Sequence, residues 1–311
     1  MSARLAAAAA ALVAAAALAG AAPARASEPD DRVARGKAVL QASGGCTCHT
    51  DVEGGGAPLA GGRPMQTPFG VWYTTNITPD RETGIGAWSD ADFLRAMREG
   101  RAPDGSAYFP TFPYTSFTGM TDDDLLALKA YLFSLPPERK ENRPPDAWPP
   151  FSWRISAWAW QLAFFRPERF EPDPAKSASW NRGAYLSTAV AHCGECHTPR
   201  NLAGALDRSR WMAGSEDGPE GELAPNITPH DDTGIGRWTT TDLVWFLQTA
   251  SKPDGDDSTG LMKEVIEEGY THVPAADLEA IAEYFESLPP IENQLMADDD
   301  AEDDGEDEDA P

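Results

Sequence analysis

Residues 192–198 read His-Cys-Gly-Glu-Cys-His-Thr, and this stretch decides how the rest of the chain is interpreted. A Cys-x-x-Cys-His run is the attachment signature of c-type haem. Residues three apart share one face of a helical turn, so Cys193 and Cys196 can both reach one edge of a porphyrin. His197 then offers its imidazole as the proximal iron ligand. Zinc would need a second ligand pair, and a thioredoxin site needs no histidine here, so haem is the favoured interpretation.

The surroundings of this motif occur twice in the chain. Motifs of unrelated residue types recur with a common offset of 150 residues, which composition alone does not produce. The sequence therefore predicts a tandem duplication. The repeated pairs are Asn-Ile-Thr-Pro at 76–79 and 226–229, Thr-Gly-Ile-Gly at 83–86 and 233–236, Trp88 and Trp238, and Pro-Asp-Gly at 103–105 and 253–255.

The first copy has a shortened motif. Residues 46–49 read Cys-Thr-Cys-His, and the glycines at 36 and 183, each ten residues before the first cysteine of its copy, place the loss between the cysteines. Cysteines two apart point to different sides of a helical turn, so attachment through both would need a distorted backbone. We expect Cys48 to anchor haem here with His49 as proximal ligand, and leave a thioether to Cys46 open. A first site without haem is the alternative, which the intact surrounding motifs disfavour.

Methionine sulfur is the expected distal ligand, because a thioether opposite histidine raises the iron potential and suits electron transfer. In the second copy Met262 is the candidate, on an expected loop before the last helix. In the first copy the offset of 150 places Phe112 at that position instead. Among Met65, Met97 and Met120 we favour Met120, which also precedes a last helix. Its alternative role is apolar packing under the helix cap.

Helical periodicity and stop signals predict the main elements. Between the copies, a proline-rich stretch leads into an aromatic-rich helix over residues 153–165, which is too short to span a bilayer. We expect this helix to pack between two domains, with docking on a partner subunit or a membrane interface as the alternative. The other predicted helices are Asp31–Ala42, Ser89–Glu99, Thr121–Leu135 and Asp277–Leu288.

The N-terminal residues predict export of the protein, and its net charge excludes nucleic acids as partners. Arg4, an apolar run over residues 5–19 and Ala-Arg-Ala at 24–26 have the order of a cleavable secretory leader, so export is expected. The formal net charge of −25 excludes nucleic-acid binding, which needs a basic face, and predicts partners with basic docking surfaces. The acidic run over 298–309 is interpreted as a disordered end, with a docking tail as the alternative.

In these motifs the chain resembles the dihaem c-type cytochromes of bacterial exported electron-transfer chains, above all the cytochrome subunits of membrane-associated alcohol, gluconate and sorbitol dehydrogenases. The resemblance extends to about residue 293 and also rests on Thr-Pro-Phe-Gly at 67–70 and Cys-Gly-Glu-Cys-His-Thr-Pro-Arg-Asn at 193–201. The chain departs from those subunits in its shortened first motif and at Phe112, where they typically carry methionine in a Met-Pro-Tyr run. They also commonly carry a third haem domain.

The resemblance implies an all-α fold of two tandem cytochrome c domains joined by a Pro/Trp-rich linker. Two covalently bound haem c groups are implied, attached through Cys46, Cys48, Cys193 and Cys196, with His49, His197, Met262 and Met120 as iron ligands. The expected segments are a signal peptide at 1–26, domains at 27–140 and 177–292, a linker at 141–176 and an acidic disordered tail at 293–311.

The implied function is electron transfer by a periplasmic protein, between a periplasmic or membrane dehydrogenase and a downstream respiratory acceptor. Location at the periphery of the inner membrane is the alternative placement. The rival function is a peroxidase-like dihaem enzyme with an open first haem. Phe112 supports that rival, but the sequence shows no acid–base pair beside the first motif. A haem-based sensor would need an output domain, and the sequence suggests none.

Overall fold

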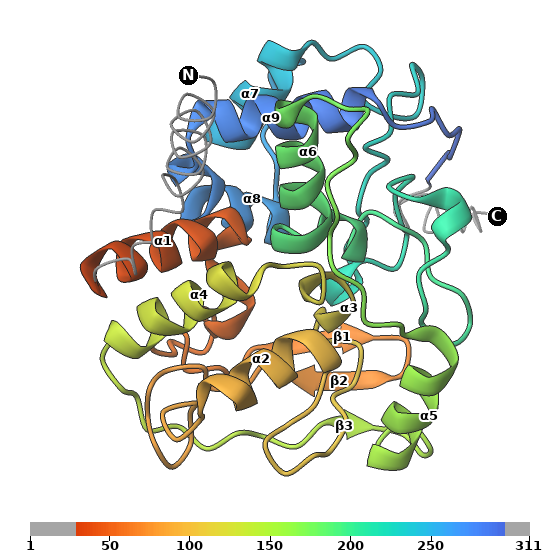
Figure 1. The fold of residues 1–311 in the computed structure, drawn as a ribbon. Coiled ribbons are helices and arrows are strands. Elements are labelled where there is room, and N and C mark those ends of the chain that lie inside the picture. The colour runs from red at the N-terminus through yellow and green to blue at the C-terminus, as the bar shows by residue number, and fades with distance from the viewer. Residues whose placement is uncertain (1–28, 296–311) are drawn as a thin grey trace, which may run out of the picture.

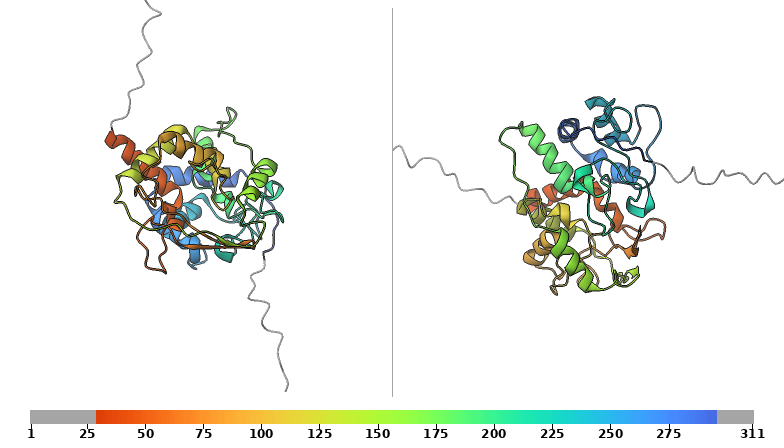
Figure 2. Two further views of the ribbon diagram at one scale, coloured as in Figure 1. Left: turned by 90° about the horizontal axis from the view of Figure 1, so that it is seen from below. Right: turned by 90° about the vertical axis from the view of Figure 1, so that its right-hand side faces the viewer.

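The computed structural model describes residues 29–295, which are mostly helical. The predicted leader and the acidic run over 298–309 lie outside the described residues. Two halves lie one above the other (Figures 1 and 2). The first half contains α1 (Pro29–Ala42), α2 (Asp90–Glu99), α3 (Tyr114–Phe117) and α4 (Asp122–Ser134). Helix α5 (Arg154–Phe164) follows. The second half contains α6 (Ala178–Tyr185), α7 (Thr240–Thr249), α8 (Gly260–Glu268) and α9 (Ala275–Glu286). The predicted helices therefore correspond to α1, α2, α4, α5 and α9.

The two halves repeat each other down to their helix caps. The Ser89 hydroxyl accepts a hydrogen bond from the Asp92 amide at the start of α2, and the Asp92 carboxylate accepts one from the Ser89 amide. Thr239 and Asp242 form the same reciprocal cap at the start of α7. Such a cap satisfies two backbone donors that a helix otherwise leaves unpaired. The likeness of the two halves therefore includes matching caps on α2 and α7.

A glycine allows the first and last helices of each half to cross closely. Helix α1 packs against α4, and α6 packs against α9. A Cβ atom added to Gly36 would lie 1.9 Å from the carbonyl oxygen of Ala127, and one added to Gly183 would lie 1.8 Å from that of Ala280. No side chain fits at such distances. The glycines that mark the repeat in the sequence are therefore the points of closest helix contact.

The all-α prediction omitted a small antiparallel sheet. Strand β1 (Pro64–Thr67) pairs with β2 (Gly70–Tyr73), which also pairs with β3 (Asp146–Ala147). The Thr-Pro-Phe-Gly stretch forms the hairpin turn, and Gly70 there has φ 125°, a conformation that favours glycine. Strand β3 comes from the proline-rich stretch of the expected linker. That stretch therefore lies along the first half.

Helix α5 contacts both halves with one face. Gln161 Nε2 donates to the carbonyl of Gly100 at 3.1 Å, and Trp160 Nε1 donates to that of Ala203 at 2.8 Å. This face agrees with the expectation that the aromatic helix packs between the halves, whereas the opposite face is exposed. Between residues 29 and 295, none of the helices combines the length and apolar composition needed to cross a bilayer.

Candidate haem cavity

One cavity of about 2250 Å³ is lined by both halves of the chain. Ordinary ligand pockets measure about 300–1,000 Å³, so this space can take two large ligands. Its walls include Trp88 and Trp238, the repeated tryptophan pair. All six residues of the two attachment motifs border this space, namely Cys46, Cys48, His49, Cys193, Cys196 and His197.

The two motif histidines have matching hydrogen bonds. His49 Nδ1 lies 2.7 Å from the carbonyl oxygen of Thr75, and His197 Nδ1 lies 2.7 Å from that of Pro225. Donation from Nδ1 leaves Nε2 as the unprotonated nitrogen, which is the arrangement of a metal-binding imidazole with an orienting partner. Burial lowers the pKa of both histidines, which keeps the rings neutral. The sequence analysis missed these two carbonyls, although each directly precedes a repeated Asn-Ile-Thr-Pro motif.

The repeated Asn-Ile-Thr-Pro motif forms a side-chain turn in each half. The Asn76 carboxamide oxygen accepts hydrogen bonds from the Thr78 amide at 3.0 Å and the Thr78 hydroxyl at 2.7 Å. Asn226 and Thr228 repeat this at 2.9 and 2.7 Å. These side-chain turns are buried in both halves. In each half the turn fixes the adjacent backbone segment, whose carbonyl group accepts the hydrogen bond from the motif histidine.

In the second motif Cys193 begins a short 3-10 turn, Cys193–Glu195, and Cys196 directly follows it. The turn is entered through a left-handed His192 (φ 45°). All four cysteines of the described chain are free of disulfide bonds. Burial raises the pKa of Cys193 and Cys196 to about 12 and that of Cys48 to about 11. The thiols are therefore protonated at neutral pH in the polypeptide itself.

The shortened first motif has an unusual backbone, and attachment through both cysteines was expected to need a distortion of this kind. Gly44, Gly45 and Cys46 are all left-handed, with φ of 77°, 73° and 55°, where the second motif has one such residue. A left-handed cysteine is strained because its Cβ crowds the backbone. The Cys46 thiol lies 3.6 Å from the Ser43 hydroxyl. A thioether to Cys46 remains a prediction left open.

Met262 borders the cavity, but its placement in the chain differs from the prediction. It lies in the first turn of helix α8 and not on a loop. Helix α8 was not among the predicted helices, because Thr259 and Gly260 gave no clear start signal. The Met262 side chain is half-buried. Its role as distal ligand of the second site stays a prediction.

The first half offers an aromatic ring at the matching position. Phe112 borders the cavity and packs on Tyr108 and Phe117, with ring centroids 5.4 and 5.9 Å away. Its phenyl ring has no atom that can bind iron. The sequence analysis therefore favoured a methionine elsewhere in the first half, Met120, as the distal ligand.

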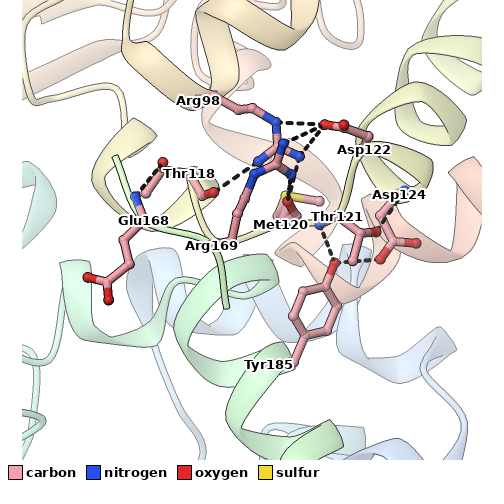
Figure 3. A network of polar contacts seen from close by, with 9 residues as sticks. All are labelled: Arg98, Thr118, Met120, Thr121, Asp122, Asp124, Glu168, Arg169 and Tyr185. Carbon is pink, nitrogen blue, oxygen red and sulfur yellow. Dashed lines mark hydrogen bonds and ion pairs between the residues drawn. The ribbon is translucent and has the colours of Figure 1, made fainter. Parts of the chain in front are cut away.

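Met120 is buried and also borders the cavity. Its amide donates to the Phe117 carbonyl as that of Val273 donates to Tyr270, so Met120 occupies the position of Val273. Arg98 and Arg169 both donate to the Met120 carbonyl, at 2.7 and 3.1 Å (Figure 3). The backbone here is therefore held firmly, and ligation by Met120 stays a prediction beside core packing. Met65 and Met97 border the cavity as well.

Each attachment loop is packed against the other half. A Cβ on Gly44 would lie 2.9 Å from Val265 of helix α8, and one on Gly45 would lie 2.9 Å from the carbonyl of Glu268. In the opposite direction, the buried Glu195 carboxylate of the second motif accepts hydrogen bonds from Thr115 and Ser116 of α3. The sequence analysis missed this reciprocal packing.

Two ion pairs lie beside these loops. Glu195 also pairs with Arg200 of its own half at 2.8 Å. Burial raises the pKa of Glu195, but Arg200 and the hydrogen bonds from Thr115 and Ser116 together lower it below its usual value. Arg63 of the first half lies 2.5 Å from Glu220 and 2.5 Å from Glu264 of the second. Glu264 is two residues beyond Met262 on α8. Arg63 thus ties the first half to the helix that carries the candidate ligand.

The residues present fit two haem groups. Both histidines are neutral with Nε2 unprotonated, the motif thiols border the same space, and its walls are aromatic and apolar. The cavity also exceeds what one ordinary ligand needs. This arrangement can hold two redox cofactors close together inside one protein.

No protein-family model matches the chain. Its sequence is 39% identical over 263 residues to a dihaem c-type cytochrome of Cereibacter sphaeroides, covering 83% of this chain and 86% of that protein. It is 37% identical to the fructose dehydrogenase cytochrome subunit of Gluconobacter japonicus over 86% of this chain, and 36% identical to the gluconate 2-dehydrogenase cytochrome c subunit of Pantoea cypripedii over 83%.

The last two relatives are much longer than the region they share with this chain. The chain spans 54% of the fructose dehydrogenase subunit and 60% of the gluconate dehydrogenase subunit. The Cereibacter protein, by contrast, matches over more than four-fifths of both lengths. On that match and on the two haem motifs that meet in one cavity, the chain belongs to the dihaem c-type cytochromes, which are electron-transfer proteins.

Proposed function

We propose that this protein is exported to the periplasm and carries electrons from a dehydrogenase to a downstream acceptor of the respiratory chain. The observation that supports this most is that both attachment motifs border one cavity. The names of the relatives support a dehydrogenase as donor, since several are cytochrome subunits of such enzymes. The net charge of −25 supports partners with basic docking surfaces.

In this proposal two haem c groups are bound covalently, one to each half. His49 and His197 are the proximal ligands. Cys48, Cys193 and Cys196 anchor the porphyrins, with Cys46 as a further candidate. Met262 is the distal ligand of the second site and Met120 that of the first. Haem supplies the one-electron redox chemistry when bound, and the protein sets its potential and its exposure.

The chain's own residues hold and shield these groups. The carbonyls of Thr75 and Pro225 orient the two imidazoles and keep the proton on Nδ1. Trp88, Trp238 and Phe112 wall the cavity with aromatic surface, which keeps water away from the site. A dry site limits the rearrangement of solvent that a change of charge would require.

Two measurements test this proposal. The intact mass of the secreted protein should exceed that of the polypeptide by two haem groups, and one adduct or none would contradict the two-haem assignment. Carbon monoxide should then be added to the fully reduced protein and the visible spectrum recorded. If the spectrum does not change, both irons hold a sixth ligand and a pure carrier is supported. If one haem binds the gas, Met120 is not a firm ligand and the first site is open.

A further inference from the structure

Helix α5 is apolar on both faces, although it lies at the edge of the molecule (Figure 1). One face is buried or borders the cavity, through Ala157 and Trp160. The opposite face exposes Ile155, Trp158 and Leu162, which are 69%, 46% and 79% accessible to solvent. These three residues follow the spacing that places side chains in one stripe along a helix. We call them the outer face of α5.

A further large apolar side chain is exposed at the start of the helix. Trp153, immediately before α5, is 56% exposed, whereas Phe164 at the other end borders the cavity and belongs to the inner face. An apolar surface of this kind marks an interaction site in a stable protein. None of the three outer-face residues borders the cavity, so the haem site does not explain them.

The charge around the outer face differs from that of the rest of the chain. The sequence holds 50 acidic residues among 311, yet none occurs between Asp146 and Glu168. Arg154 and Arg166 stand at the two ends of α5, and the Arg101 guanidinium lies 3.1 Å from the centre of the Trp158 ring. The outer face is therefore apolar and framed by cations.

We propose that the outer face of α5 binds the surface of an anionic lipid bilayer, with the helix lying in the plane of the interface. A helix with tryptophan, leucine and isoleucine on one side and arginine at its borders is suited to this position. Its eleven residues are too few to span a bilayer, which needs about 20. At about 0.15 M salt the Debye length is about 8 Å, so the headgroups sense the charges beside α5 most. These are Arg101, Arg154 and Arg166, with Glu99 near Arg101 and Asp104 near Arg154.

A bilayer fits this face better than a second protein does. Protein interfaces carry about one hydrogen bond per 100–200 Å² of buried surface. The outer face presents one polar side-chain group, the Trp158 indole N–H, beside the alkyl groups of Ile155 and Leu162. Lipid chains need no hydrogen-bond partners, and the indole N–H suits the headgroup region. Binding there would place the haem cavity about one helix diameter, ~10–12 Å, from the lipid headgroups.

The test is flotation of the haem-loaded full chain with vesicles at about 0.15 M salt. One set of vesicles contains phosphatidylcholine and phosphatidylglycerol in equal parts, and the other contains phosphatidylcholine alone. We expect the protein to float with the anionic vesicles and much less with the neutral ones. The triple variant Ile155→Ser/Trp158→Ser/Leu162→Ser should bind at least about tenfold more weakly, because the inserted apolar surface is lost.

The matched control is Trp245→Ser, which removes a tryptophan that is 57% exposed on α7, at the opposite end of the molecule (Figure 1). It should bind like the wild type. The haem spectrum and the unfolding midpoint of each variant establish that the fold is intact. Failure of the wild type to float would assign the outer face to a protein partner and overturn the proposal. Equal binding to both vesicles, or equal loss in the control, would overturn it as well.

Discussion

Replacing Arg63 by glutamine tests the contact that joins the two halves beside the candidate ligand Met262. The Arg63, Glu220 and Glu264 side chains are 12%, 20% and 35% exposed, and both ion pairs measure 2.5 Å. Removing one partner of a fully buried pair costs about 3–5 kcal/mol, whereas an exposed pair contributes about 0–1 kcal/mol. The ion pairs of Arg63 are partly buried, so their contribution to stability should lie between these two values. We therefore expect Arg63→Gln to lower the free energy of unfolding by about 2 kcal/mol.

The chain offers a matched control for burial. Arg139 pairs with Glu82 at 2.6 Å, but these side chains are 69% and 65% exposed, so Arg139→Gln should cost less than about 1 kcal/mol. Guanidinium unfolding of the haem-loaded chain measures both variants. The red absorption band of a thioether-ligated ferric haem should weaken only in Arg63→Gln, since Glu264 lies beside Met262 on α8. Equal destabilisation of the two variants would refute this reasoning.

Three further variants test separate parts of the site. Gly36→Ala should destabilise the fold by about 1–3 kcal/mol in guanidinium unfolding, because the new Cβ would lie 1.9 Å from a carbonyl oxygen, whereas alanine in an open helix is the better residue. Ala38→Gly, at an exposed position of the same helix, is its control and should cost about 1 kcal/mol. Cys48→Ser should remove one haem from the intact mass, while Cys46→Ser should retain both. Phe112→Met should supply a thioether at the first site, so carbon monoxide binding by the reduced protein should not exceed that of the wild type, and stronger binding would contradict that role.

The sequence was sufficient to identify the residues and motifs that the two copies have in common. Repetition singled out the motifs that begin at Asn76 and Asn226 and the glycines at 36 and 183, and the structure shows that each meets the same local requirement in both halves. The small sheet was missed for a physical reason. Strands β1 and β2 have four residues each, too few to display an alternating pattern, and β3 has two within a proline-rich stretch.

Contacts between the halves could not be predicted in the same way. Arg63 with Glu264, and Glu195 with Ser116, join residues 201 and 79 positions apart, and neither pair has a counterpart in the other copy among the described residues. A sequence repeat reveals residues that are needed for the structure of each copy by itself. Packing between units depends on complementary side chains that carry no period, so it is visible only once the chain is folded.

The shortened first motif links these two kinds of constraint. Gly44, Gly45 and Cys46 are left-handed, whereas in the second motif only His192, the counterpart of Gly45, has this conformation. The same two glycines lie against helix α8 of the other half, where any side chain would meet Val265 or Glu268 at 2.9 Å. Backbone conformation and close approach therefore both require glycine here. A motif that looks degenerate in isolation is therefore closely packed against helix α8 of the other half, so its glycines are constrained by that contact as well as by the motif.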